Sequence, residues 1–168
     1  QKNIDEKRTK YNQVLVNILN VDTSSSTSLS QQVSEHYQKL GIREKSNNVL
    51  MLEFVVSASP QFFNNKSKQD IEKWAQHQVD FFQKEFGQQL KMAILHLDEK
   101  SPHIHFCVTT EHLSVKKYKN QKGEFHKETW SLNAKRYDPE FLAELHTRHA
   151  LHNKPYGLVR GVRGSVRS

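Results

Sequence analysis

The sequence has one cysteine, Cys107, and no apolar run long enough to cross a membrane. A single thiol cannot form an internal disulfide, which favours a reducing, cytoplasmic compartment. A membrane-spanning helix needs about 20 apolar residues, so none is expected. No secretory signal and no internal repeat are visible, and the length of 168 residues favours one domain. The chain begins with Gln1 and not with Met, so we expect that its true start is missing.

Positive charge is abundant, but only in the last third of the chain. The sequence has 25 Lys and Arg against 18 Asp and Glu, a net charge of +7. Residues 1–111 contain 13 of each sign, so residues 112–168 hold 12 (25 − 13) against 5 (18 − 13). A local excess of this kind is expected where a protein contacts a phosphate backbone. The alternative is a basic tail that only improves solubility.

Hydrophobic periodicity and turn residues predict an α+β domain. Asp138 followed by Pro139 indicates a helix start, and Ser67 with Asp70 resembles a capping box. We expect an antiparallel sheet with helices packed mainly on one face, and with the other face open to a metal and DNA. The predicted segments are strands over 13–19, 48–57, 92–97 and 103–109; helices over 29–40, 67–87 and 138–152; a loop over 60–66; a basic ribbon over 115–130 with a turn at 120–123; and a flexible basic tail over 153–168.

Three histidines surround a predicted turn between two strands. Side chains alternate between the faces of a strand, so His103 and His105 share one face and Ile104 and Phe106 share the other. Pairing the strands so that their apolar residues form a core puts His96 on the same face as the other two imidazoles. This is a three-histidine metal site in outline. The alternative is a polar-faced hairpin whose histidines meet solvent.

Other chemistry-bearing residues have two interpretations each. Glu53 is the single charge in the apolar run 48–57, which reads as a buried central strand. It could order a ligand, a water or an arginine beside the metal, or it could lie near an exposed strand edge. Parity places Cys107 on the histidine face, where we expect an inert sheet residue and not a nucleophile. A row of histidines on the last helix is interpreted as a solvated face and not as a second metal site: His146, His149 and His152.

One stretch resembles a known motif. The pattern His96-x-Asp98-Glu99-x-x-Pro102-His103-x-His105 is similar to the metal motif of the Mob/Pre plasmid mobilisation relaxases, the MobV-type branch of the HUH endonucleases. Three weaker similarities occur in the same order as in that family: Asn3-Ile4-Asp5 with Arg8 and Asn12, then Leu132-Asn133-Ala134-Lys135, then Gly157-Leu158-x-Arg160-Gly161.

The resemblance implies a bacterial, cytoplasmic enzyme with a HUH relaxase fold over residues 1–168. Such enzymes nick one DNA strand at a plasmid origin of transfer, stay joined to the 5′ phosphate and transfer the strand. It implies metal ligation by His96, His103 and His105, with Glu99 and Glu53 as further catalytic candidates. Imidazole ligands suit transition metals, so Mn²⁺ is favoured over Mg²⁺. Asp98 could hold the tautomer of one ligand.

In the family, the nucleophile and an accompanying arginine lie upstream of the Asn-Ile-Asp segment. We therefore expect the N-terminal strand and the nucleophile to precede Gln1. Tyr11 is the nearest candidate within the chain, and an ordinary aromatic residue is the alternative for it.

The expected partner is single-stranded or hairpin DNA at a plasmid origin. Candidate DNA-binding residues are Arg8, Lys116, Lys117, Lys135, Arg136, Arg160 and Arg163. Three other functions are considered: a rolling-circle replication initiator, a non-catalytic origin-binding module or repressor, and a metallohydrolase of small substrates. The basic last third argues against a small substrate, because counterion release rewards a polyanionic partner.

Overall fold

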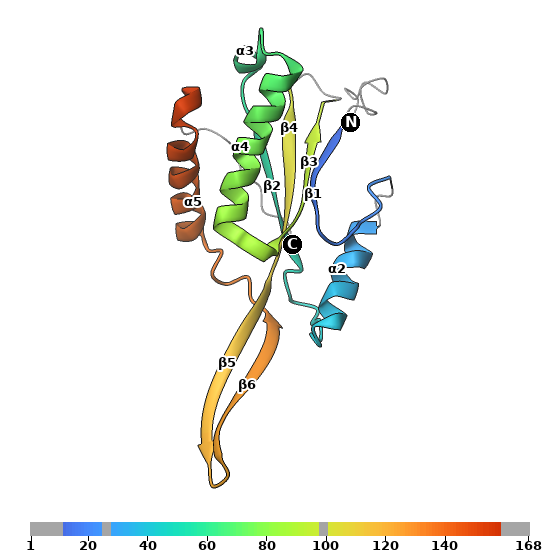
Figure 1. Ribbon diagram of the computed structural model, residues 1–168, viewed down its shortest axis with the longest axis vertical. Helices are drawn as coiled ribbons and strands as arrows, with labels where there is room; N and C mark the ends of the chain where they lie inside the picture. The colour runs from blue at the N-terminus through green and yellow to red at the C-terminus, as the bar shows by residue number, and fades with distance from the viewer. Residues whose placement is uncertain (1–11, 25–27, 98–100, 159–168) are drawn as a thin grey trace.

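The computed structural model describes residues 12–24, 28–97 and 101–158. It confirms the predicted α+β architecture, with one four-stranded sheet and one two-stranded ribbon (Figure 1). The elements are β1 Gln13–Asn17, α2 Ser28–Lys39, β2 Met51–Ser57, α3 Pro60–Phe63, α4 Lys68–Phe86, β3 Leu90–His96, β4 His103–Thr109, β5 Glu111–Asn120, β6 Gly123–Leu132 and α5 Pro139–His152, with 3₁₀ turns at Gly87–Gln89 and Lys154–Tyr156.

The four-stranded sheet is antiparallel, in the order β1-β3-β4-β2. The prediction that 48–57 is a central strand is wrong, because β2 lies at an edge. Only its alternate residues Leu52, Phe54 and Val56 are buried; the others are half-buried. The apolar run arises because both faces of β2 contact hydrophobic clusters, and not because strands flank it on both sides.

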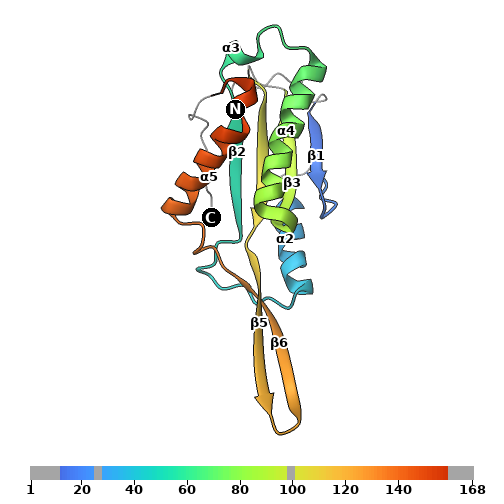
Figure 2. The same cartoon turned by 60° about the vertical axis from the view of Figure 1, so that its left-hand side comes forward.

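Helices α4 and α5 cover one face of the sheet (Figures 1 and 2). The aromatic stripe of α4 belongs to this core: Phe82 stacks on Phe106 of β4, with ring centroids 3.8 Å apart and planes 9° apart. The predicted caps are present. Ser67 accepts a hydrogen bond from Asp70 N–H, and Asp138 accepts one from Phe141 N–H. The predicted loop 60–66 begins with the short helix α3, which Ser59 caps.

Helix α2 covers part of the opposite face of the sheet. Leu29 of α2 and Met51, Met92 and Cys107 of the sheet belong to one hydrophobic cluster on that face. Tyr37 of α2 is fully buried, and its hydroxyl donates to the carbonyl oxygen of Leu50. The histidines lie on the other half of this face, where His103 is 9% exposed and His96 and His105 are half-buried. No helix within the described ranges is long and apolar enough to span a bilayer.

The ribbon β5–β6 extends from the end of β4 away from the sheet (Figures 1 and 2). Its turn joins the pair Asn120 and Gly123, as predicted. At its root, Lys91 Nζ lies 2.8 Å from Glu111 Oε1, and both side chains are at most 6% exposed. Burial opposes ionisation of Glu111, but the hydrogen bond and charge of Lys91 outweigh it and hold the pKa of this carboxyl below its usual value. This ion pair fastens the ribbon to β3.

Residues 153–158, the first part of the predicted flexible tail, are folded. Asn153 is 1% exposed, and Tyr156 packs edge-on against Phe62 with ring centroids 6.0 Å apart. The rest of the predicted tail, 159–168, lies outside the described residues.

Replacing one member of the buried ion pair is expected to destabilise the fold strongly. Glu111→Gln leaves the Lys91 ammonium buried without its counter-charge, which costs about 3 kcal/mol or more. The double variant Lys91→Met, Glu111→Leu should be much closer to the wild type, because both charges are gone. Urea unfolding of the three proteins measures the difference. A double variant no more stable than Glu111→Gln would show that the charges are not the cause.

Candidate metal centre and nucleic-acid surface

The register of β3 against β4 brings the three predicted ligands together. His96 pairs directly with His103, and His105 pairs with Ile94 two positions along. Residues opposite one another in an antiparallel pair share a face, so all three imidazoles lie on the face that α4 and α5 do not cover. The ring centroids are 5.1 Å apart for His96–His103, 4.6 Å for His96–His105 and 4.9 Å for His103–His105. The predicted parity is confirmed.

These separations suit rings placed around one ion. A ring nitrogen about 2.1 Å from a metal puts the centroid about 3.2 Å away, so two ligating rings at 90° to 109° have centroids about 4.5 to 5.2 Å apart. The planes of His96 and His103 are 12° apart, and the plane of His105 makes angles of 74° with His96 and 63° with His103.

Within 12–24, 28–97 and 101–158, no group of three or more His, Cys, Asp and Glu side chains is arranged to hold an ion as it stands. The terminal torsion of histidine is broad, so rotation about χ2 turns a ring without moving the strand. The donor set fits a transition metal in composition and in spacing.

Hydrogen bonds at the end of β3 and the start of β4 orient two of the rings. His103 Nδ1 lies 3.3 Å from the carbonyl oxygen of Ser101. A carbonyl only accepts, so Nδ1 carries the proton and Nε2 keeps its lone pair. Asn12 accepts from Leu97 N–H at 2.8 Å, and its amide nitrogen lies 3.3 Å from His96 Nδ1. In this arrangement a neutral His96 carries its proton on Nε2, so ligation of an ion through Nε2 requires the other tautomer, with the proton on Nδ1. The sequence singled out neither Ser101 nor, beyond the weaker similarity, Asn12.

Glu53 and Cys107 lie on the histidine face, opposite each other on β2 and β4. Glu53 is one alternate position from Val55, the partner of His105. Glu53 is half-buried on an edge strand and shares the face of His105, and its proposed role beside the metal stays a prediction. Burial raises the pKa of the Cys107 thiol to about 12, and the thiol contacts Met51 Sδ at 3.2 Å. A buried, neutral thiol agrees with the predicted inert role.

Several predicted site residues fall outside the described residues: Tyr11, Asp98, Glu99, Arg8, Arg160 and Arg163. Their roles stay predictions.

The remaining candidate DNA-binding residues are exposed but do not form one patch. Lys116 and Lys117 are neighbours in β5, so they point to opposite faces of the ribbon. Lys135 and Arg136 lie in the segment between β6 and α5. Arg136 donates to Gln89 Oε1 and stacks over the ring of Tyr137, 4.7 Å from its centroid.

The interpretation of the α5 histidines as a solvated face is wrong for His149. Its Nε2 lies 2.7 Å from Gln78 Oε1 in a buried contact with α4. His152 stacks on His77 with centroids 3.8 Å apart. The prediction failed because α5 packs against α4 through His149 and His152. Burial, with help from neighbouring histidines, lowers the pKa of His149 to about 4.

Comparison with known proteins identifies the family. A family profile described as "Plasmid recombination enzyme" matches residues 1–168, the whole chain. The chain belongs to the plasmid recombination enzyme family, Mob_Pre. The resemblance seen in the histidine motif is thus confirmed.

Family members of known sequence are longer than this chain. A plasmid recombination enzyme of Bacillus thuringiensis is 31% identical over 106 residues, which are 62% of this chain and 23% of that protein. A plasmid recombination enzyme type 1 of Staphylococcus aureus is 28% identical over 130 residues, 74% of this chain and 31% of that protein. The chain thus spans about a quarter to a third of these curated relatives.

Solved structures agree with the fold. The MobM relaxase domain, in a Mn-bound crystal structure with plasmid pMV158 oriT DNA, superposes with a TM-score of 0.72. That comparison covers 96% of this chain and 75% of the MobM chain at 20% identity. A second MobM crystal structure, at pH 5.5, gives a TM-score of 0.67 with 96% and 77% coverage and 20% identity. At this identity the comparison establishes the fold of the Mob_Pre chain.

The buried His149 is expected to make the Mob_Pre chain less stable in weak acid. Its pKa is about 4 when folded against 6.5 for a free histidine. Between pH 6.5 and pH 4, His149 is therefore protonated in the unfolded chain but not in the folded protein. The free energy of unfolding falls as the pH falls through this window. The loss approaches about 3 kcal/mol.

Urea unfolding between pH 4 and 7.5 measures this loss. His149→Gln should flatten the pH dependence, whereas the exposed control His112→Gln should leave it unchanged. An NMR titration that placed the pKa of His149 near that of a free histidine would contradict the account.

Proposed function

We propose that this Mob_Pre chain is part of a metal-dependent DNA relaxase domain, which nicks one strand at a plasmid origin of transfer, joins it through a 5′ phosphate and transfers it, with the nucleophile supplied by residues that precede Gln1. The observation that carries the proposal is the three-imidazole cluster, with ring centroids 4.6 to 5.1 Å apart on the face of the sheet opposite to α4 and α5. Family membership and the neighbouring fold support it. A bacterial cytoplasm, where plasmid DNA resides, is the proposed location.

His96, His103 and His105 would hold a divalent ion, with Mn²⁺ favoured over Mg²⁺ because three imidazoles suit a transition metal. A bound ion supplies a Lewis acid that polarises the scissile phosphate. Neighbouring residues hold the histidine rings in place whether or not an ion is bound. Ser101 fixes the His103 tautomer, and Ser57 Oγ donates to Pro102 O at 3.0 Å, which fastens the start of β4 to β2. The three rings are therefore carried on paired strands and not on a loop.

Glu53 lies on the histidine face of β2 and is proposed to orient a water or a metal-bound group there. Glu99 keeps the role that the family motif implies, and Asp98 is proposed to hold the tautomer of one ligand. Tyr11 is kept only as the candidate nucleophile nearest to the expected one within the chain. The DNA strand is proposed to follow the exposed basic residues, with Lys116 and Lys135 as backbone contacts and Arg8, Arg136, Arg160 and Arg163 as further candidates. Lys117 points to the opposite face of the ribbon from Lys116 and is not included in this set.

A plasmid relaxation assay tests the function. Protein that includes this chain is incubated with supercoiled plasmid carrying its origin, with Mn²⁺ or with Mn²⁺ and EDTA. Relaxed plasmid with protein attached to a 5′ end, formed only without EDTA, is expected. Metal-independent binding without nicking would favour the non-catalytic module. Nicking at a replication origin and not at a transfer origin would favour the rolling-circle initiator.

His103→Ala is expected to lower nicking at least about a hundredfold, because one imidazole ligand of the ion is lost. Affinity for the origin DNA should change less than about threefold, because phosphate contacts dominate it. His126→Ala, which removes an exposed histidine of the ribbon, is the matched control and should keep full activity. An equal collapse of DNA affinity and nicking in His103→Ala would instead give the ion a structural role.

A further inference from the structure

The β5–β6 ribbon, residues 111–132, projects from the domain as an arm whose two faces differ in charge. Residues that pair directly share a face, so the register sorts every side chain. Lys116 faces Lys127, and the next pair on that side is Tyr118 with Phe125. We call this side the lysine face. It carries no Asp or Glu between Ser114 and Thr129.

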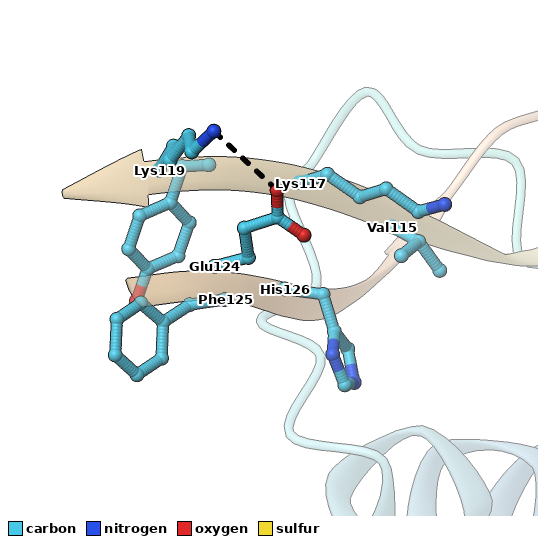
Figure 3. Close-up of a pocket in the computed structure, with 7 residues that line it drawn as sticks. Val115, Lys117, Lys119, Glu124, Phe125 and His126 are labelled. Carbon is cyan, nitrogen blue, oxygen red and sulfur yellow. Dashed lines mark ion pairs between the residues drawn. The ribbon is translucent and has the colours of Figure 1, made fainter. Parts of the chain in front are cut away.

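The other side, the balanced face, carries equal charges of both signs. Its pairs are Val115 with Glu128, Lys117 with His126, and Lys119 with Glu124. Figure 3 shows the ion pair Lys119–Glu124, which spans 3.6 Å between Nζ and Oε1. His126 and Glu128 lie 4.0 Å apart on the same side. The lysines of the balanced face have carboxylate neighbours, so they attract a polyanion less strongly than unpaired lysines would.

On the lysine face, Lys116 and Lys127 are both exposed and directly opposite each other. Like charges in this position destabilise a strand pair. No acidic side chain on this face offsets the repulsion between the two lysines. A phosphate that lay between the two ammonium groups would offset it. The pair therefore forms an anion site that a phosphate backbone can fill.

Next to this pair, Tyr118 and Phe125 offer flat apolar surface. Their ring centroids are 5.6 Å apart with planes at 23°, and they are 47% and 39% exposed. A pocket beside these rings is lined mainly by the balanced face, with Lys117, Lys119 and Glu124 among its residues, so it is not part of the lysine face (Figure 3). Exposed aromatic rings beside lysines are the combination with which proteins hold single-stranded nucleic acid, because an unpaired base stacks on the ring.

The arm leaves the sheet at the end of β4 opposite to the histidines (Figure 1). From His105 to Tyr118 the chain advances 13 residues, at most about 43 Å at about 3.3 Å per residue. This upper limit is of the same order as one turn of duplex DNA, about 34–36 Å. The arm and the histidines can therefore contact one DNA molecule at two separate places.

We propose that the lysine face of the arm holds an unpaired stretch of the DNA substrate at a place separate from the three-histidine centre. Lys116 and Lys127 bind a phosphate, and Tyr118 with Phe125 stacks a base. This inference rests on the proposed function for the choice of DNA as the partner. It adds Lys127 as a phosphate contact, together with two aromatic residues.

A pair of variants on the two faces tests the assignment. Lys116→Gln with Lys127→Gln is compared with Lys117→Gln with Lys119→Gln, which removes the same charge from the balanced face. The probe is fluorescein-labelled single-stranded oligo-dT of about 20 nucleotides, which spans one such binding site. Fluorescence anisotropy gives its affinity across a salt series, and thermal unfolding confirms that the variants are folded.

The lysine-face variant is expected to bind about tenfold more weakly at low salt, with a salt slope smaller by about 0.7, because one phosphate contact is lost. The balanced-face variant should change affinity less than about twofold. Tyr118→Leu with Phe125→Leu should lose about tenfold or more with an unchanged slope, because stacking and not charge is removed. Tyr118→Phe, which keeps the ring, should bind like the wild type.

Equal losses from the two faces, a larger loss from the balanced face, or no oligo-dT binding by the wild type would overturn the proposal. So would a lysine-face variant that keeps oligo-dT binding but loses binding to phosphatidylglycerol vesicles, since the arm would then be a membrane contact. Plasmid nicking is measured in parallel. A protein that does not nick yet shows the face-dependent binding refutes the proposed function alone; one that nicks without face dependence refutes the arm alone.

Discussion

The candidate site depends on one constraint, the register between β3 and β4. His96 pairs with His103, and Ile94 with His105, and a shift of one residue would move the imidazoles of one strand to the covered face. The core fixes this register. Phe106, between His105 and Cys107 in sequence, points to the other face and stacks on Phe82 of α4 at 3.8 Å. The buried contacts of β4 with α4 therefore also fix the position of the histidines on the opposite face. The three imidazoles are brought together by paired strands and not by a loop.

The same strand connects the two proposed contacts with DNA. β4 carries His103 and His105 at one end and continues after Thr110 into β5, whose root is fastened by the Lys91–Glu111 ion pair. Helix α2 covers the part of the sheet between them, since Leu29 packs with Met92 and Cys107. The histidine half of the sheet and the arm are thus separate surfaces, joined where β4 leads into β5. A DNA molecule that reaches both must extend along β4 and β5.

The sequence was sufficient for features set by local pattern. Period-two alternation gave the histidine face, Asp138-Pro139 gave the start of α5, and the residues around Gly123 gave the arm's turn. Features set by tertiary contacts were missed. The apolar residues of β2 meet hydrophobic clusters on both faces at a sheet edge, and His149 packs against Gln78, 71 residues away in sequence. The split between Lys116 and Lys117 follows from alternation, but pairing Lys116 with Lys127 requires the register.

The central claim is that His96, His103 and His105 hold one divalent ion. Crystals of the protein soaked in Mn²⁺ and measured near the manganese absorption edge test it most directly. The account predicts one anomalous peak about 2.2 Å from a nitrogen of each ring. It also predicts that at least one of the three rings has turned about χ2. A peak held by other side chains, or three histidines without a peak at saturating Mn²⁺, would contradict it.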